Sequence, residues 1–189
     1  MNRDERALWN ERHRGKSAGD AEPFFVEMLA RMPKGLALDI AAGRGRHSIP
    51  MARAGMRVVA VDIADAAMRA LKAVVDKERL AIFPAIANLD TFFFGTRCFD
   101  AIVNTNFLDR ALFPKFIDAL KPGGVLLADT FLIDQARTGH PRDPRFLLKH
   151  GELRELMNGL DIAVYREGLV TYRDGSSAWR GSALGVKRS

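Results

Sequence analysis

The sequence predicts an α/β fold in which helices cover both faces of a doubly wound, mostly parallel sheet. Short apolar segments alternate along the chain with segments of helical spacing, and this alternation implies parallel strands joined by right-handed crossovers. The segment at residues 125–129 is apolar up to its last residue, as expected for a strand covered on both faces. The expected parallel strands are residues 36–40, 57–61, 80–86, 99–104 and 125–129.

Two helices are expected before the first strand. Residues 2–15 have the composition of a charged helix that places Trp9 and Arg12 on one face. Residues 21–32 have an apolar face, and Pro23 suits the first turn of a helix. We expect these helices to cover a ligand pocket at the end of the sheet.

The segments between the strands also carry helix signals. Residues 47–54 end before Gly55, which favours a helix stop there. Residues 64–75 place apolar side chains on one face. A further helix is expected near Phe113, because Pro114 is tolerated in a first turn.

The last part of the chain is expected to contain a long loop, a helix and a hairpin. Residues 131–150 contain scattered Gly and Pro, so they form either a lid over a substrate or a packing loop. Residues 151–158 have helical spacing. Arg173-Asp-Gly175 marks a turn between strands at residues 161–170 and 177–187.

The strongest functional signal is a glycine turn between two acids. Asp39 lies near the end of the first expected strand, Gly43 and Gly45 follow it, and Asp62 comes directly after the second strand. This spacing suits the first βαβ crossover of a nucleotide-binding sheet, in which an acid at the tip of the second strand accepts hydrogen bonds from ribose hydroxyls.

Asp39 separates two classes of cofactor. A dinucleotide site has a third glycine and directs a helix N-terminus at a pyrophosphate, which a nearby acid would repel. This chain has Ser48 at the position of the third glycine. An acid there favours a cation, and S-adenosylmethionine carries a sulfonium and an ammonium but no phosphate.

With these residues the sequence resembles the class I S-adenosylmethionine-dependent methyltransferases. The resemblance implies a Rossmann-like sheet of seven strands with the last strand antiparallel, which the terminal hairpin can supply. It also implies one domain over residues 1–189, with residues 1–35 as a helical cap and residues 36–189 as the core sheet. The segments at residues 9–12, 43–47, 120–124 and 144–153 are similar to small bacterial methyltransferases of the tellurite-resistance type.

The resemblance implies ten cofactor-binding residues. Those of the first strand and the glycine turn would face the methionine end, Asp62 would hold the ribose and Ile63 would line the adenine. Asn88 stands where such enzymes often have an acid, and Arg12 is either a partner of the cofactor carboxylate or an ordinary surface arginine. The ten are Arg12, Asp39, Ala41, Gly43, Gly45, Asp62, Ile63, Asn88, Leu89 and Asn104. Asn104 and its neighbour Thr105, at the end of the fourth strand, are expected near the sulfonium.

Methyl transfer from a sulfonium is an in-line displacement that needs alignment and a dry pocket more than an acid–base pair. The sequence accordingly assigns no catalytic residue and no metal site. His47, His140 and His150 are candidate bases, although a helix-start position for the first and loop surface for the others are simpler interpretations.

A small-molecule methyl acceptor is the favoured partner. The segment Asn104-Thr-Asn-Phe107 lacks the Pro-Pro pair common in enzymes that methylate base amines, and Cys98 does not follow a proline as a cytosine C5 nucleophile would. A net charge of +6 keeps an RNA or protein methyltransferase as an alternative. A noncatalytic cofactor-binding module is the other alternative, because Asn88 departs from the expected acid.

Composition bounds the class of protein. The 189 residues are 48% hydrophobic and 28% charged, the balance of a globular domain. A single cysteine cannot form an internal disulfide, and neither a long apolar run nor a signal peptide is present. We therefore expect a cytoplasmic protein that does not enter a membrane, and the oligomeric state stays open.

Overall fold

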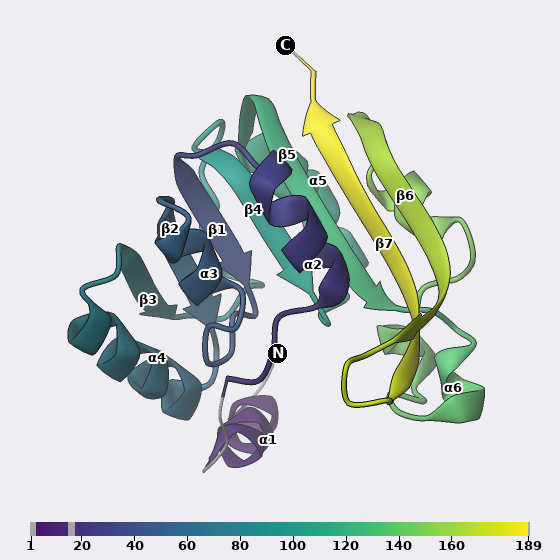
Figure 1. Ribbon diagram of the computed structural model, residues 1–189, viewed down its shortest axis with the longest axis horizontal. Coiled ribbons are helices and arrows are strands. Elements are labelled where there is room, and N and C mark those ends of the chain that lie inside the picture. The colour runs from purple at the N-terminus through teal and green to yellow at the C-terminus, as the bar shows by residue number, and fades with distance from the viewer. Residues whose placement is uncertain (1–2, 15–17, 189) are drawn as a thin grey trace.

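A computed structural model describes residues 3–14 and 18–188 and contains one seven-stranded sheet (Figure 1). The strands lie in the order β3-β2-β1-β4-β5-β7-β6. The first five are parallel, and β7 is antiparallel to both β5 and β6. The predicted Rossmann-like fold class with its antiparallel last strand is confirmed. The strands are β1 Leu36–Ile40, β2 Arg57–Asp62, β3 Ile82–Ile86, β4 Phe99–Thr105, β5 Leu120–Phe131, β6 Leu160–Thr171 and β7 Ser177–Lys187.

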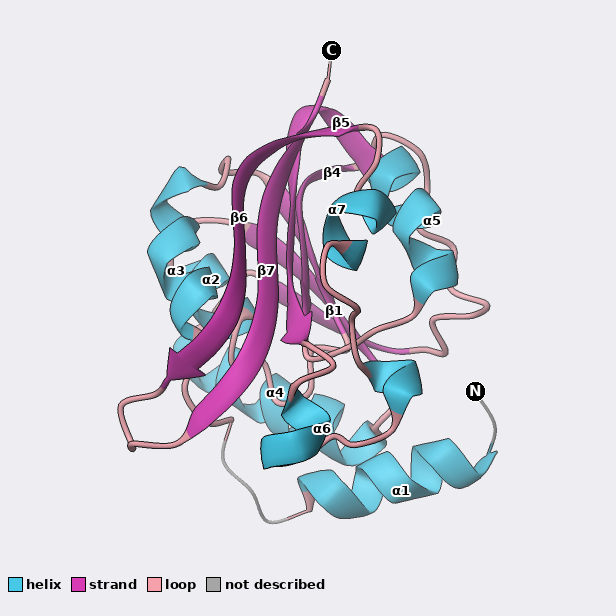
Figure 2. Cartoon of the chain, turned by 90° about the vertical axis from the view of Figure 1, so that its right-hand side faces the viewer, coloured by secondary structure: helices cyan, strands magenta, loops and turns pink. Residues whose placement is uncertain are grey.

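Helices lie on both faces of this sheet, and α1 lies beyond the end to which the parallel strands point (Figures 1 and 2). The α2–α4 helices contribute Phe25, Met51 and Leu71 to the core on one face, and α5 contributes Phe116 to the core on the other. The α-helices are α1 Arg3–His13, α2 Pro23–Met28, α3 Ser48–Arg53, α4 Asp65–Glu78, α5 Phe113–Ala119, α6 Gln135–Thr138 and α7 Glu152–Leu156, and short 3-10 turns occupy Leu29–Arg31, Arg110–Leu112 and Pro144–Phe146.

Side-chain alternation along β1 explains why both faces are covered. Leu38 and Ile40 are fully buried in the core on the α5 face, whereas Ala37 is buried in the core on the α3 and α4 face. Successive side chains of a strand point to opposite faces, so an apolar strand needs partners on each side. The small side chain of Ala37 leaves room for α3 and α4 on that face of the sheet.

The second helix is shorter than the predicted span of residues 21–32. Pro23 forces the preceding Glu22 into an extended conformation, with φ −60° and ψ 139°, so the helix begins only at Pro23. Its last turn tightens into a 3-10 turn, and Met32 is extended in front of Pro33 for the same steric reason. The two prolines therefore set both limits of the helical segment.

The stretch at residues 131–150 is more ordered than the sequence suggests. It contains α6 and a 3-10 turn, Leu147 and Leu148 are buried, and Leu148 packs in the core against the sheet. Arg110 anchors it, because the guanidinium donates to the carbonyl oxygens of Arg145 and Leu147 and to the carboxylate of Glu152. These contacts favour the packing-loop interpretation over a lid.

Among the described residues, no helix combines the length and the apolar character that crossing a membrane requires.

Candidate functional site

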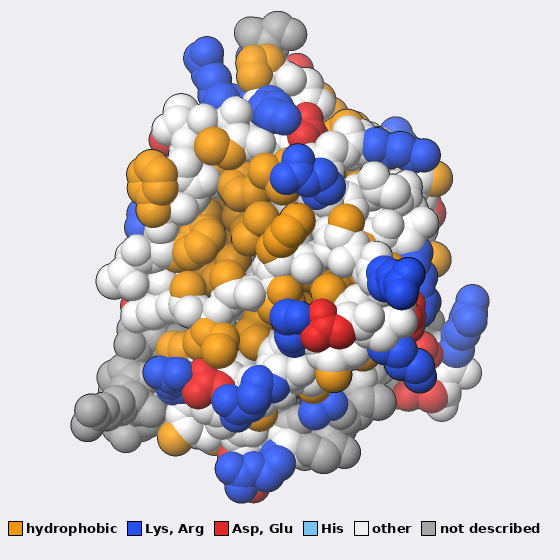
Figure 3. All heavy atoms as spheres, turned by 90° about the vertical axis from the view of Figure 1, so that its left-hand side faces the viewer, with side chains coloured by type: hydrophobic (Ala, Val, Ile, Leu, Met, Phe, Trp, Pro, Cys, Tyr) orange, Lys and Arg blue, Asp and Glu red, His pale blue; other side chains and the backbone are white. Residues whose placement is uncertain are grey.

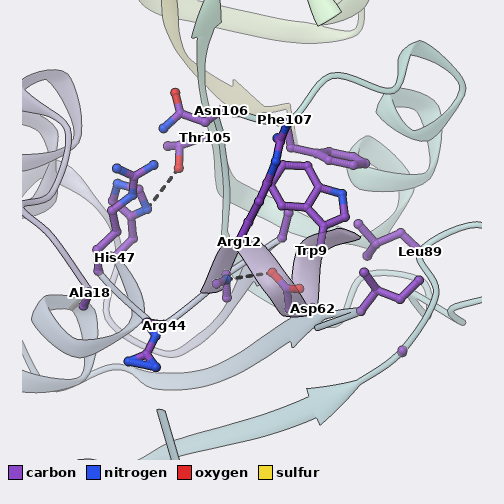
Figure 4. Close-up of a pocket in the computed structure, with 16 residues that line it drawn as sticks. Trp9, Arg12, Ala18, Arg44, His47, Asp62, Leu89, Thr105, Asn106 and Phe107 are labelled. Carbon is purple, nitrogen blue, oxygen red and sulfur yellow. Dashed lines mark hydrogen bonds between the residues drawn. The ribbon is translucent and has the colours of Figure 1, made fainter. Parts of the chain in front are cut away.

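A cavity of about 340 Å³ lies at the carboxyl ends of β1, β2 and β4 (Figure 4). These ends are level in the sheet, because Ile40 pairs with both Val61 and Asn104. Trp9 and Arg12 of α1 also line the cavity. The ends of the strands and the first helix together form its walls, as the doubly wound topology leads one to expect.

The glycine turn after β1 forms one wall and has left-handed backbone conformations. Gly43 has φ +55° and Gly45 has φ +84°, values that glycine adopts without steric cost. Gly45 is also needed for packing, because a Cβ atom there would lie 2.5 Å from Cδ1 of Leu71 in α4. The turn therefore brings its backbone close to both the cavity and α4.

Asp62 ends β2 at the cavity and is held by two backbone amides. The N–H of Gly43 donates to Oδ2 at 2.8 Å, and the N–H of Ala64 donates to Oδ1 at 2.8 Å. A carboxylate oxygen has two lone pairs, so each oxygen can still accept a second hydrogen bond. The carboxylate is thus oriented before any ligand binds.

The ten residues that the sequence singles out divide into two groups in the structure. Six line the cavity, namely Arg12, Ala41, Gly43, Asp62, Ile63 and Leu89. Asp39, Gly45, Asn88 and Asn104 are not among the residues that line it.

Asp39 lies deeper than Asp62 although both side chains are on the same face of the sheet. Asp39 pairs with Ala60, so Asp62 lies two residues, or about 6.6 Å, further along the strand direction. Asp39 is fully buried, and Ser48 Oγ donates to its Oδ2 at 2.5 Å. Burial raises the pKa of Asp39 from 3.8 to about 7.

Neither asparagine is among the residues that line the cavity. Asn88 is half-exposed and its Oδ1 accepts the N–H of Asp90 at 3.0 Å in a local turn, whereas the neighbouring Leu89 lines the cavity. Asn104 is buried in β4, and its Oδ1 has no hydrogen-bond partner among the described residues.

The two ends of the cavity differ in polarity. Leu89 lies at one end of the cavity (Figure 4), and the apolar side chains of Ile63 and Ala87 also line the cavity. His47 and Thr105 lie at the other end, on the far side of Asp62 in this view. The cavity therefore suits a long ligand with an aromatic or apolar end and a charged or polar end.

Sequence reasoning gave several lining residues no place in the cofactor site, and it considered His47 only as a candidate base. His47 is 2% exposed, and burial beside the guanidinium groups of Arg46 and Arg180 lowers its pKa to about 3. The ring is therefore neutral at ordinary pH. Its position two residues after Gly45 was the available signal, whereas its contact with Thr105, 58 positions away, was not visible in the sequence. Thr105, which the sequence placed beside Asn104 near the sulfonium, lines the cavity although Asn104 does not. The other lining residues without a predicted role are Trp9, Ala18, Ala42, Arg44, Arg46, Ala87, Asn106 and Phe107.

A buried ionic cluster supports the polar end from behind. Arg180 of β7 is 2% exposed and donates from Nε to Asp129 Oδ1 at 3.0 Å and from Nη1 to Asn106 Oδ1 at 2.5 Å. Asn106 in turn donates to Glu22 Oε1 at 2.7 Å. Because an unpaired buried charge is costly, this cluster holds the segment before α2 and the loop after β4 in place.

The chain is similar to known methyltransferase structures. A model of the methyltransferase domain matches residues 37–124. No curated protein matches the sequence. TehB from Haemophilus influenzae is 19% identical with a TM-score of 0.77, over 97% of this chain and 67% of that one.

Two further solved structures share the fold over almost their whole length. Magnesium protoporphyrin IX methyltransferase from Synechocystis, with bound S-adenosylhomocysteine, is 17% identical with a TM-score of 0.72, over 97% of this chain and 98% of that one. A protein of echinomycin biosynthesis, described with the conversion of a disulfide bond into a thioacetal group, is 18% identical with a TM-score of 0.76. The match covers 97% of this chain and 93% of that one.

The resemblance seen in the sequence is thereby confirmed. Residues 37–124 match a methyltransferase domain, and the fold is that of class I methyltransferases, which supports an S-adenosylmethionine-dependent enzyme. TehB, a tellurite-resistance protein, is among the proteins that share its fold.

Proposed function

We propose that this enzyme transfers the methyl group of S-adenosylmethionine to a small-molecule acceptor by in-line displacement. The observation that carries the proposal is the cavity at the carboxyl ends of β1, β2 and β4, in which Asp62 is oriented by the amides of Gly43 and Ala64. An oriented carboxylate between an apolar end and a polar end matches a nucleoside joined to an amino acid.

The residues present fit the cofactor along its whole length. Ile63 and Leu89 would contact the adenine, and the carboxylate of Asp62 would accept the ribose hydroxyls. The polar end would hold the amino-acid part, with Arg12 near its carboxylate. Asp39, Gly45, Asn88 and Asn104 would act from behind this wall by holding its backbone in place.

The cofactor supplies an activated methyl group, so the protein has to align the acceptor and exclude water. The titratable groups of the described cavity wall offer no free base. Both nitrogens of the neutral His47 ring are engaged. Each oxygen of Asp62 accepts one backbone amide and would use its remaining lone pair for a ribose hydroxyl. We infer an acceptor whose attacking lone pair is available without proton removal by the enzyme.

The position of helix α1 supports a small acceptor. Helix α1 lies against α4, where Arg6 pairs with Asp65 and Asn10 accepts the N–H of Ala66, so Trp9 and Arg12 narrow the entrance. We also propose that residues 1–189 form one domain with residues 1–35 as its cap, and that the enzyme acts in the cytoplasm.

The proposal is tested by calorimetric titration with S-adenosylhomocysteine and, in parallel, with NAD. Binding of S-adenosylhomocysteine in the micromolar range without binding of NAD is expected. Binding of NAD alone would contradict the proposal. Binding of S-adenosylhomocysteine with no turnover on a broad set of small acceptors would favour the noncatalytic module instead.

Asp62→Ala is expected to weaken S-adenosylhomocysteine binding by about 10- to 100-fold, because hydrogen bonds to a charged group contribute about 1.5–3 kcal/mol. Titration calorimetry measures the change. Asp76→Ala is the matched control, since it removes an exposed aspartate of α4. Equal affinities of the Asp62→Ala variant and the wild type would refute the ribose role.

A further inference from the structure

Thr105 ends β4 at the polar end of the cavity and is in contact with a buried histidine. Its Oγ1 lies 3.0 Å from Nδ1 of His47 (Figure 4). The His47 ring is packed edge-on against Phe25, with ring centroids 4.7 Å apart. Because both residues are nearly inaccessible to solvent, the ring has little freedom to turn.

The hydrogen bonds determine which nitrogen of the ring carries the proton. The backbone N–H of Glu22 donates to Nε2 at 3.4 Å, so Nε2 presents its lone pair. A neutral imidazole has one N–H, which is then on Nδ1 and donates to Thr105 Oγ1. The low pKa of His47 agrees with a neutral ring.

The direction of the hydroxyl follows from this tautomer. Thr105 Oγ1 accepts from His47, so its own proton has to be donated elsewhere. The only hydrogen bond of Oγ1 to the described residues is the one with His47. Thr105 lines the cavity, and its hydroxyl is therefore free to donate a hydrogen bond to a group in the cavity.

We propose that the Thr105 hydroxyl donates a hydrogen bond to the carboxylate of the bound cofactor and that His47 is the positioning residue that sets its direction. This inference rests on the proposed function. The carboxylate is the one anionic group of S-adenosylmethionine, and the apolar opposite end of the cavity places it at the end that contains Thr105. The sulfonium and the ammonium accept no hydrogen bond.

The test compares two ligands by titration calorimetry. S-adenosylhomocysteine carries the carboxylate, whereas 5′-deoxy-5′-methylthioadenosine has the same adenine, ribose and thioether without the amino-acid part. Thr105→Val replaces the hydroxyl by a methyl group of similar size. It is expected to weaken binding of S-adenosylhomocysteine by about tenfold or more and binding of the methylthioadenosine by less than about twofold.

Two further variants separate positioning from packing. Thr105→Ser keeps the donor and is expected to retain affinity for S-adenosylhomocysteine within about threefold of the wild type. His47→Phe keeps the ring against Phe25 but frees the hydroxyl to rotate, and it is expected to weaken S-adenosylhomocysteine selectively by a smaller factor than Thr105→Val. Thermal unfolding verifies that each variant is folded.

The outcomes are distinguishable. An equal loss of affinity for both ligands in Thr105→Val would show a packing role and overturn the inference, as would unchanged affinity for S-adenosylhomocysteine. Either result leaves the proposed function standing, because the wild type still binds the cofactor product. A wild type that binds neither ligand would overturn the proposed function and this inference together.

Discussion

At the scale of single residues, Asp39 links the stability of the fold to pH. Its carboxyl group is fully buried beneath α3, and that burial raises its pKa to about 7. An aspartate in the unfolded chain titrates near 3.8. The folded chain therefore binds this proton more tightly, and the stabilisation is fully present below about pH 4 and lost as the pH rises through about 7.

Asp39→Asn is expected to remove this pH dependence, because the amide is neutral at every pH. The difference in free energy of unfolding between variant and wild type should grow in favour of the variant from about pH 4 to about pH 7. Urea denaturation at a series of pH values measures it. The pKa of His47 shifts in the opposite direction, but His47 is present in both proteins. Its contribution to the free energy of unfolding therefore cancels when the wild-type value is subtracted from the variant value.

Asp76→Asn is the control for Asp39→Asn, because Asp76 is exposed on α4. Its difference from the wild type should stay nearly constant over the same range of pH. A flat difference for Asp39→Asn would show that Asp39 is ionised in the folded chain, contrary to the expected effect of burial.

At the scale of elements, the turn after β1 depends on packing as well as on backbone conformation. Gly45 and Gly55 both have positive φ, +84° and +92°. A Cβ atom at Gly45 would meet the fully buried Leu71 of α4, whereas a Cβ atom at Gly55 would meet nothing within 4 Å. A substitution at Gly55 therefore introduces backbone strain alone, whereas one at Gly45 introduces both backbone strain and steric overlap.

Gly55→Ala is expected to cost about 1–2 kcal/mol of stability through its backbone conformation alone. Gly45→Ala should cost about 1–3 kcal/mol more, because α4 has to shift to accommodate the methyl group. Chemical denaturation of both variants measures the two costs. Equal losses would mean that Leu71 moves aside freely.

At the scale of the whole molecule, several surface arginines lie in ion pairs. Arg53 pairs with Glu78, Arg166 with Glu27 and Arg188 with Asp161 on the surface. On the face beside β3, hydrophobic side chains gather in the middle, and Lys and Arg lie at the margin, several of them next to acids (Figure 3). A face of this kind lacks the continuous basic stripe that binds a phosphate backbone.

We therefore expect a single-stranded RNA oligonucleotide to bind no more tightly than about 10⁻⁴ M at physiological salt, the weak end of nonspecific binding. Fluorescence anisotropy at low and moderate salt measures this, and S-adenosylhomocysteine titrations at the same salt serve as the control. Tight RNA binding that falls steeply with salt would instead favour the RNA methyltransferase alternative.

Much of this architecture follows from local spacing in the sequence. The strand at residues 36–40 and the terminal strand at residues 177–187 have the predicted bounds, because apolar runs and turn residues mark their limits. The other limits differ by a few residues, and β5 extends furthest, to Leu120–Phe131. Its first residue pairs with Phe99 of β4, and its last residue pairs with Arg180 of β7. Such pairing is a property of the sheet, not of the segment.

The sequence by itself determined the fold class, the glycine turn and the acid at the tip of β2, because each depends on residues close together in the chain. Only the tertiary structure decided which polar groups meet. Asp39 and Asp62 look alike in the sequence, yet strand register places one in the core and the other at the cavity. The contact of His47 with Thr105 joins segments whose spacing carries no periodic signal, since long-range packing alone brings them together.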